Sequence, residues 1–529
     1  MRVESREAIH VAAVDSGPRL PALVLPIACG AAGGALLIFS FPRFNLFPLA
    51  WIALVPWLAL LPRLTFKQAL LSSLSLGFVF FAGLLYWVAI FGYLPWLLLA
   101  LFQALFVVAA GLGLWFCRGL SSIWRIAAAP SLWITFEWLR GCGPFGFTWG
   151  WLGYSQSPWL DLLQLAAITG PLGLSFLILL HNAALAEAVR SLQMRRRSVA
   201  PLAAAWGVIV AIVLIGHYWL RPQAALPSNL KVAIVQPSNR ELEAEEVNRV
   251  LTLEELRPGF ALLARLSAQA AAGKPDLIVW PESALPIFLN QDREQLTWIG
   301  QLARETQAWL LLGAAFENAA GEPQNSTYLF SPQGDLVGHS EKVQLVPFGE
   351  FVPARDWLPG LKNYPMRDYD LVPGRDWKPL AAGSIRPGVS ICFESIFPRI
   401  SRRLTGQGAN LLLVITNDGW FRNTAAPAQH RQMAVFRAVE NRRWVVRAAL
   451  TGISCFISPA GRITQQLGLH RSGVIIETVG VGEGKTFYLR HGDWFVVLAA
   501  LLAVSCLFMS GKQTRYSSRR TKSVSPDNA

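Results

Sequence analysis

The stretch Gly388-Val-Ser-Ile-Cys-Phe-Glu-Ser-Ile-Phe-Pro398 (GVSICFESIFP) begins as an apolar β run and ends in a thiol and a carboxylate. A free cysteine at the end of a strand is usually a small buried residue without reactivity. Cys392 is therefore a candidate nucleophile only if neighbouring segments supply groups that activate a thiol. The residues around it decide both the fold of this part of the chain and its chemistry.

The segment around this stretch, residues 221–490, alternates short β runs with helical patterns such as Leu253–Ala272 and Pro427–Arg442. Its interior runs, DLIVW and NLLLVIT, are almost continuously apolar, as expected for strands covered on both faces. The segment is also long enough for one complete domain. The pattern predicts an α/β layered domain.

Two further β runs of this segment end in charged residues. LIVWPESALP places Glu282 directly after a strand, and HSEKVQLVPFGEFVP carries Lys342 and Glu350. Glu394 follows Cys392 by two residues. Because strands of layered α/β folds present their ends at one edge of the sheet, we expect these groups to meet there. Taken singly, each could also be a helix cap, a surface charge or a turn residue.

The chemistry of a thiol nucleophile requires these residue types. A thiol attacks as the thiolate, so a base must take its proton. Glu282 is the candidate base, and the acid when the leaving group departs. Lys342 is the candidate stabiliser of the thiolate and of a tetrahedral oxyanion, and the backbone N–H of Phe393 is the candidate second oxyanion donor.

Other chemistries have weaker support in the sequence. A cysteine–histidine protease is the rival arrangement, and His339, His430 and His470 lie in the same segment, but none stands in a stretch like a known Cys–His signature. The six cysteines contain no Cys-x-x-Cys pair, which argues against a disulfide framework or a structural zinc site. We expect no metal and no cofactor.

The composition of the whole chain indicates a membrane protein. Of 529 residues, 53% are hydrophobic and 15% are charged, whereas soluble domains average about 25% charged residues. The net charge of +14 could suggest nucleic acid. However, the basic residues cluster beside apolar runs and in the C-terminal tail, so we expect no nucleic-acid partner.

Eight apolar windows come close to or exceed the roughly 20 residues that span a bilayer. The predicted spans are Leu20–Phe41, Leu46–Leu61, Ala69–Gly92, Pro95–Cys117, Ile123–Leu139, Leu163–Ala186, Val199–Leu220 and Trp494–Ser510. Lys and Arg concentrate before the first span and after the second, fourth, sixth and eighth, which places both ends of the chain in the cytoplasm.

This topology divides the chain into four parts. Residues 1–220 hold spans one to seven, residues 221–490 form an extracytoplasmic domain, residues 491–511 hold the last span, and residues 512–529 form a basic, disordered cytoplasmic tail. In the loop before span six, Trp149, Trp151, Tyr154 and Trp159 suit the membrane–water interface. A contact with a lipid substrate is the alternative role for these rings.

The motifs WPES, EKVQLVPFGEFVP and CFES resemble those of the nitrilase superfamily, whose domains use a Glu-Lys-Cys triad. With TNDGWF and the segment PAQHRQMAVFRAVENRRWVVRAALTGISCFISPAGRI that follows, the chain resembles the apolipoprotein N-acyltransferases from its first span to its eighth. The resemblance implies a multi-span α-helical membrane domain of about eight helices, with a nitrilase-like αββα sandwich inserted between the last two spans.

Carried over residue by residue, the resemblance makes Glu282 the general base, Lys342 the oxyanion stabiliser and Cys392 the nucleophile. Glu350 becomes a further essential carboxylate and Glu394 a supporting one. Two departures from the family pattern stand out. Phe393 replaces the usual tyrosine, and VQPSNRELEAEE replaces a Gly-Asn motif and tryptophan near Ser238 and Asn239.

The resemblance also implies the reaction and the partners. The sn-1 acyl chain of a phospholipid, expected to be phosphatidylethanolamine, passes through a cysteine thioester to the N-terminal amine of a diacylglyceryl-cysteine lipoprotein. We expect a monomer in the bacterial inner membrane, with the catalytic domain on the periplasmic side.

Substrate contacts are predicted in two places. PARDWLPGLKNYPMRDYDLVPG (353–374), with Trp357 and Tyr364, is interpreted as a mobile lid that touches lipid, with a static surface loop as the alternative. Trp420 is expected to shape the acyl pocket or simply to pack. Two other functions stay open: a membrane-anchored nitrilase-type amidase, and an inactive scaffold subunit of a lipid glycosyltransferase.

Overall fold

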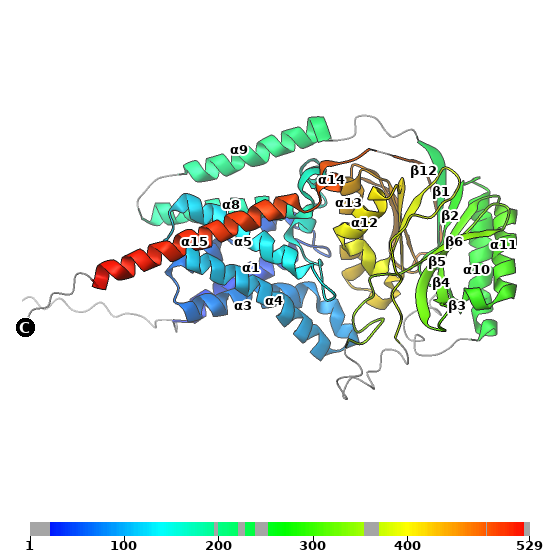
Figure 1. The fold of residues 1–529 in the computed structure, drawn as a ribbon, viewed down its shortest axis with the longest axis horizontal. Coiled ribbons are helices and arrows are strands. Elements are labelled where there is room, and N and C mark those ends of the chain that lie inside the picture. The colour runs from blue at the N-terminus through cyan, green and yellow to red at the C-terminus, as the bar shows by residue number, and fades with distance from the viewer. Residues whose placement is uncertain are drawn as a thin grey trace, which may run out of the picture.

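The computed structural model describes residues 22–194, 199–220, 228–238, 252–353, 370–482 and 484–522. It has two parts, which Figure 1 shows end to end. One is a bundle of lengthwise helices, and the other is a pair of β-sheets with helices on their outer faces. The α/β elements follow α9 in the chain and precede α15. The predicted lid residues Trp357 and Tyr364, and Asn239 of the divergent segment, lie outside the described residues.

The helical part contains α1 (Val24–Phe39), α3 (Phe66–Leu84), α4 (Tyr93–Phe116), α5 (Ser122–Arg140), α8 (Pro171–Gln193), α9 (Ala200–Ile215) and α15 (Trp494–Lys522). Among the described residues, five helices are long and apolar enough to cross a membrane: Phe66–Leu84, Tyr93–Gly119, Pro171–Gln193, Ala200–Tyr218 and Trp494–Gln513. They correspond to predicted spans three, four, six, seven and eight. The count of eight stays a prediction.

Close helix packing in this part depends on small residues. A Cβ added to Gly30 of α1 would lie 2.2 Å from the carbonyl oxygen of Ser72, and one added to Gly34 would lie 2.6 Å from that of Leu76, both in α3. Small residues let helix backbones approach one another, which is the usual basis of helix association in membranes.

Several boundaries differ from the prediction, including that of the third span, where α3 ends at Leu84 and not at Gly92. The second span is broken into η1 (Phe47–Trp51), α2 (Val55–Leu60) and η2 (Leu61–Arg63). The sixth begins at Pro171, after the short helices α6 (Leu160–Leu163) and α7 (Ala166–Thr169), because Gly170 takes a left-handed φ of 69° and proline favours the first turn of a helix. The last helix, α15, continues beyond the predicted end of the eighth span as far as Lys522, and the disordered tail stays a prediction.

The α/β part is a sandwich of two sheets. The 7-stranded sheet has the order β12-β1-β2-β4-β5-β6, with β3 paired to β4, and the 5-stranded sheet has the order β11-β10-β9-β8-β7. The strands of the first sheet are β1 (Ser228–Gln236), β2 (Leu277–Val279), β3 (Leu285–Phe288), β4 (Trp309–Glu317), β5 (Pro323–Phe330), β6 (Leu336–Glu341) and β12 (Gly473–Gly480). Those of the second are β7 (Pro387–Ile391), β8 (Leu411–Thr416), β9 (Val445–Ala449), β10 (Ser454–Ile457) and β11 (Ile463–Leu467).

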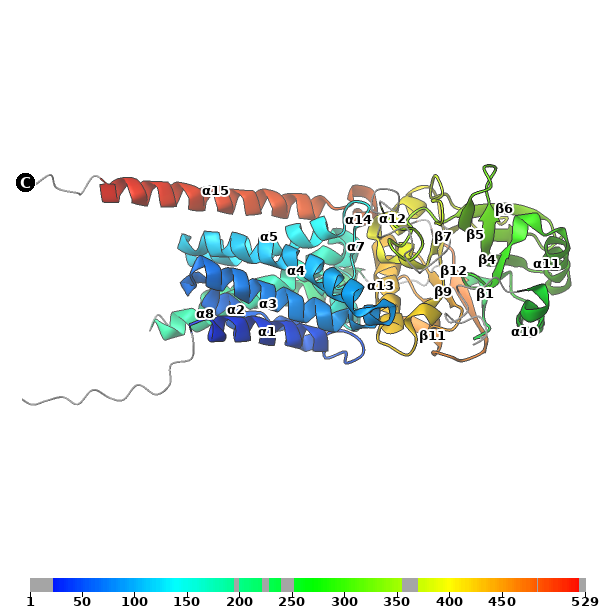
Figure 2. The ribbon, with the colours of Figure 1, turned by 90° about the horizontal axis from the view of Figure 1, so that it is seen from below.

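Helices cover the outer face of each sheet, which confirms an α/β layered domain. α10 (Leu253–Ala271) and α11 (Arg293–Thr306) cover the first sheet at the far end of the molecule, and α12 (Pro398–Gly406) and α13 (Ala426–Asn441) lie between the second sheet and the helical part (Figures 1 and 2). Between the sheets, an apolar core joins strands of both, including Ile234 and Leu413.

The two parts share one hydrophobic core. Residues of α13 such as Met433 and Phe436 belong to the same buried cluster as Trp149, Trp151 and Tyr154 from the loop before α8. These three aromatic residues are therefore buried against the α/β part rather than exposed on the surface, and their place at the membrane–water interface stays a prediction. The nucleophile turn that precedes α12 consequently rests on the helical part.

Candidate active site

The candidate site lies where strands of both sheets end. Glu282 follows β2, Lys342 follows β6, and Cys392 follows β7 as the first residue of the short helix η10 (Cys392–Ile396). Cys392 has a φ of 52°, and Ser283, the residue after Glu282, also has a φ of 52°. Left-handed backbone is costly for residues with a side chain and is concentrated at functional sites. At Cys392 it makes a sharp strand-to-helix turn, a geometry that presents a nucleophile at the top of a sheet.

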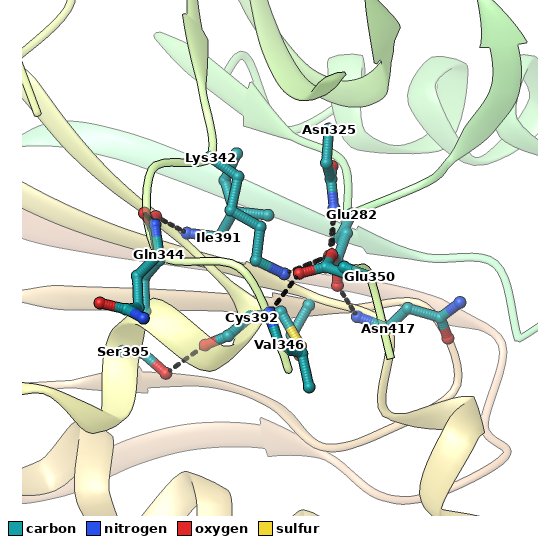
Figure 3. A network of polar contacts seen from close by, with 12 residues as sticks. Glu282, Asn325, Lys342, Gln344, Val346, Glu350, Ile391, Cys392, Ser395 and Asn417 are labelled. Carbon is teal, nitrogen blue, oxygen red and sulfur yellow. Dashed lines mark hydrogen bonds and ion pairs between the residues drawn. The ribbon is translucent and has the colours of Figure 1, made fainter. Parts of the chain in front are cut away.

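Lys342 is the centre of the charged groups. Its amine lies 2.8 Å from Glu350 Oε1 and 3.4 Å from Glu282 Oε1, and its side chain is 1% exposed. Figure 3 shows this amine, both carboxylates and the Cys392 sulfur converging. Burial alone would lower the pKa of Lys342, but Glu350 and Glu282 raise it well above its usual value. Lys342 is therefore a permanent cation beside the thiol.

Glu282 is held at both oxygens. Asn325 Nδ2 of β5 donates to Oε1 at 2.8 Å, and the backbone N–H of Asn417 donates to Oε2 at 2.7 Å. Asn325 Nδ2 also lies 3.3 Å from Glu350 Oε1, so it links the two carboxylates. Neither asparagine was predicted as a site residue. The carboxylate of Glu282 thus has a fixed orientation toward Lys342 and Cys392.

Glu350 stabilises the turn that follows Lys342. Its Oε2 accepts the backbone N–H of Val346 at 2.9 Å, while its Oε1 takes the ion pair with Lys342. Phe348, within the same turn, has a φ of 63°. The carboxylate therefore joins the loop backbone to the buried cation, and its expected role as an essential group stays a prediction.

Cys392 is partly exposed as a residue, and it packs against the apolar core between the two sheets. Burial and the negative charge of Glu282 raise the pKa of this thiol, and Lys342 and a hydrogen bond with Thr416 act in the opposite direction. The raised pKa keeps the thiol protonated at rest. Reaction therefore requires a base, and Glu282 is the carboxylate placed to act as one.

Glu394 is buried, with 1% exposed, and accepts four hydrogen bonds. Three come from backbone N–H groups, of Ile391 at 2.9 Å, Val343 at 2.9 Å and Gln344 at 3.0 Å, and one comes from Trp377 Nε1 at 2.8 Å. Burial raises the pKa of Glu394, although these donors oppose the shift. Glu394 ties the Cys392 turn to the segment after Lys342, which makes it a positioning residue.

The remaining predicted residues lie at the side of the site nearest the helical part. The Phe393 ring stacks on Phe147, with ring centroids 6.2 Å apart. The Trp420 ring lies 6.4 Å from that of Phe91. Both aromatic partners belong to the helical part, so Phe393 and Trp420 both contact that part, and a role of Trp420 in an acyl pocket stays a prediction.

Two of the three histidines named for the rival arrangement, His339 and His430, do not form it. His430 Nε2 lies 3.2 Å from the backbone carbonyl oxygen of Cys392 and 2.7 Å from Ser395 Oγ, whereas His339 pairs with Glu341 at the surface. Glu282 and Lys342 are the charged groups that act most strongly on the thiol. Among the residues that the structure describes, no group of three or more metal-ligating side chains occurs.

An αββα sandwich with a glutamate, a lysine and a cysteine at its strand ends is the architecture of the nitrilase class. Residues 231–485 match the family described as carbon-nitrogen hydrolase, and residues 33–184 match the one described as apolipoprotein N-acyltransferase N-terminal domain. Among solved structures, an amidase from Nesterenkonia sp. AN1 is similar at 18% identity, with a TM-score of 0.37, over 51% of this chain and 99% of that one.

Full-length relatives give the particular family. The chain is 37% identical to the apolipoprotein N-acyltransferase of Geobacter metallireducens, over 90% of this chain and 94% of the relative. It is 33% identical to that of Azotobacter vinelandii, over 92% and 95%, and 30% identical to that of Thermotoga maritima, over 90% and 92%. The chain belongs to the apolipoprotein N-acyltransferase family.

Proposed function

We propose that this protein transfers a fatty acyl chain from a phospholipid, through a thioester on Cys392, to the N-terminal amine of diacylglyceryl-cysteine lipoproteins. The observation that carries the proposal is the buried Glu282–Lys342–Glu350 cluster beside the Cys392 sulfur (Figure 3). The layer that contains this thiol packs on helices apolar enough to cross a membrane. Membership of the family supplies the class of reaction.

The first half-reaction forms the thioester. Glu282 takes the proton of the Cys392 thiol, and the thiolate attacks the carbonyl carbon of the sn-1 ester. The Lys342 amine and the Phe393 N–H stabilise the oxyanion that forms. When the oxyanion collapses, the bond from carbon to the glycerol oxygen breaks, and Glu282 returns the proton to that oxygen as the lysophospholipid leaves.

The second half-reaction forms the amide. The neutral amine of the lipoprotein attacks the thioester carbonyl, and Glu282 takes the proton that the nitrogen loses. The same two donors stabilise the second oxyanion. Collapse breaks the carbon–sulfur bond, and the departing thiolate of Cys392 recovers a proton from Glu282. The enzyme returns to its starting state, which makes the mechanism ping-pong.

The position of the site suits substrates that are held in a bilayer. A site that rests on membrane helices confines the search for both lipids to the membrane surface, which lowers the entropic cost of bringing them together. Acyl chains around the thioester also exclude water and favour transfer over hydrolysis. The proposal includes eight spans, a monomer, phosphatidylethanolamine as donor and a periplasmic position for residues 221–490 in the bacterial inner membrane.

Labelling of the enzyme tests the proposal. The purified full-length protein is incubated with phosphatidylethanolamine that carries a labelled sn-1 chain, and label released by neutral hydroxylamine is measured. We expect one thioester-linked chain, which disappears in Cys392→Ala and is discharged by a diacylglyceryl-cysteine peptide. Hydrolysis of simple amides by a protein that is not labelled by phospholipid would favour an amidase. Unchanged lipoprotein N-acylation in cells with Cys392→Ala would favour a scaffold.

A further inference from the structure

A second buried polar cluster lies on the other side of the Cys392 turn from the catalytic ion pairs. It comprises Arg447 on β9, Asp418 in the helix η11 (Asp418–Phe421), His430 on α13 and Ser395 in η10. All four side chains are buried. None of them has a part in the two half-reactions described above.

The cluster forms a continuous chain of hydrogen bonds that ends on the nucleophile. Arg447 Nη2 lies 2.9 Å from Asp418 Oδ2 and 3.0 Å from His430 Nδ1. His430 Nε2 lies 2.7 Å from Ser395 Oγ, and Ser395 Oγ donates to the carbonyl oxygen of Cys392 at 2.8 Å.

The donor and acceptor roles in this series of hydrogen bonds follow from the chemistry of its members. A guanidinium only donates, so His430 Nδ1 accepts from Arg447 and Nε2 carries the ring proton. Asp418 Oδ1, 3.1 Å from Nδ1, already accepts from Arg447 and from Thr416 Oγ1. Burial and Arg447 lower the pKa of His430, which keeps the ring neutral. The Nε2–H therefore donates to Ser395, whose own hydroxyl proton is directed to the Cys392 carbonyl.

We propose that this relay of Arg447, His430 and Ser395 fixes the peptide plane between Cys392 and Phe393, so that the Phe393 N–H points at the oxyanion. In a trans peptide the C=O and the following N–H point in opposite directions. Figure 3 shows the Cys392 carbonyl oxygen turned toward Ser395, on the side away from Glu282. Holding that oxygen consequently directs the N–H toward the catalytic groups.

The turn needs such a restraint because its backbone is strained. Cys392 has a φ of 52°, and a non-glycine residue in this region persists only where its surroundings hold it. Without the relay, the peptide can rotate and withdraw the Phe393 N–H from the oxyanion. His430 and Ser395 are thus positioning residues, and the inference rests on the proposed function.

Two reactions of the same thiol test the inference. Alkylation of Cys392 by iodoacetamide requires the thiolate but forms no oxyanion, whereas acylation by phospholipid requires both. In Ser395→Ala and His430→Phe we expect single-turnover acylation of the full-length protein to slow about 10-fold or more. Alkylation should stay within about threefold of the wild-type rate. His430→Gln, which retains a donor, should recover part of the lost acylation rate.

Ser401→Ala is the matched control. Ser401 is also buried, with 3% exposed, and its hydroxyl donates to the carbonyl three residues earlier, that of Pro398 at 3.2 Å. We expect this variant to acylate at the wild-type rate, and thermal unfolding shows whether each variant is folded.

Two results would overturn the inference: unchanged acylation in Ser395→Ala, or alkylation that falls as far as acylation, which would give the relay a role in thiol activation. A wild-type protein that is alkylated but never acylated would instead contradict the proposed function, on which the inference depends.

Discussion

The helices α11 and α13 occupy equivalent layers of the sandwich but differ in environment. Only 5 of the 14 residues of α11 are buried, whereas 14 of the 16 residues of α13 are buried. α11 covers the first sheet at the outer end of the molecule, and α13 lies between the second sheet and the helical part (Figure 2). One helix has a face open to solvent, and the other is enclosed on both sides.

The difference shows what the polar residues of α13 do. Gln429 bonds to Trp149 Nε1 and to the carbonyl of Pro42, so it holds two loops of the helical part. Arg437 donates to the carbonyl of Ile396 at 2.9 Å and to the hydroxyl of Tyr154 at 3.2 Å. α13 therefore joins the nucleophile turn to the membrane helices, whereas α11 only covers a sheet.

The largest effect is expected at the turn that α13 supports. Cys392→Ala and Cys392→Ser should both abolish acyl-enzyme formation, because alanine has no nucleophile and a serine hydroxyl is too weakly acidic for Glu282 to activate. The label that each variant retains after incubation with labelled phospholipid measures acyl-enzyme formation. Cys142→Ala is the control, since Cys142 is also partly exposed and should be dispensable. A Cys392→Ala protein that still carried the acyl group would place the nucleophile elsewhere.

The next largest effect is expected at Lys342, the buried cation that follows β6. Lys342→Ala removes an oxyanion donor and should lower turnover on the order of 10²-fold or more. Lys378→Ala is the matched control, because Lys378 has a side chain that is 74% exposed and lies 3.8 Å from Asp376. The turnover of both lysine variants is measured with phospholipid and a diacylglyceryl-cysteine peptide. Near-full turnover in Lys342→Ala would remove the assigned role.

The third effect is expected at α13, the helix that joins the α/β part to the helical part. Above neutral pH, at pH 8, Arg437→Met leaves Glu440, its partner at 2.7 Å, as a buried carboxylate without its cation. Removing one partner of a buried ion pair costs about 3–5 kcal/mol, so we expect a large fall in the unfolding temperature in detergent. If the variant were as stable as the wild type, α13 would not be the joint between the two parts.

The fourth effect is a dependence of stability on pH. Burial raises the pKa of Glu440 from 4.5 to about 7, against the pull of Arg437. Between these two values the folded state holds a proton that the unfolded state has lost. Stability should therefore fall by about 3 kcal/mol as the pH rises from 4.5 to 7, and should then stay constant. Glu440→Gln should flatten this slope in thermal unfolding at pH 5 and pH 8, and an unchanged slope would point to other groups.

The smallest effect is expected on α11. Arg304 lies on the solvent face and donates to the carbonyl of Gln333 at 3.3 Å. Arg304→Ala should change stability by no more than about 0.5 kcal/mol, as is usual for surface substitutions. Thermal unfolding beside Arg437→Met measures the contrast between the two helices. Equal losses of stability in Arg304→Ala and Arg437→Met would show that α11 and α13 contribute alike to stability.

The strand ends were predictable because each leaves a local pattern: an apolar run followed by a charged residue or a thiol. Glu282, Lys342 and Cys392 were found in this way, and the structure brings them together. Asn325 left no such signal. Its role arises because β5 pairs antiparallel with β4, which carries it to the two carboxylates, and sheet pairing is not a local property of the sequence.

The burial of the aromatic loop before α8 could not be predicted for a similar reason. Tryptophan and tyrosine suit both a membrane interface and a packed core. Which environment Trp149 takes depends on Gln429, which is 280 residues away in the chain. The sequence around His430 suggests only a protease arrangement, since nothing near it marks its contact with the carbonyl of Cys392.

The most direct test of the account is peptide mass spectrometry of the full-length protein after incubation with a phosphatidylethanolamine whose two acyl chains differ in mass. The account predicts that the Cys392 peptide gains the mass of the sn-1 chain and loses it on addition of a diacylglyceryl-cysteine peptide. A Cys392 peptide that stays unmodified while lipoprotein N-acylation proceeds would contradict the claim that Cys392, assisted by Glu282 and Lys342, carries the acyl group from one lipid to the other.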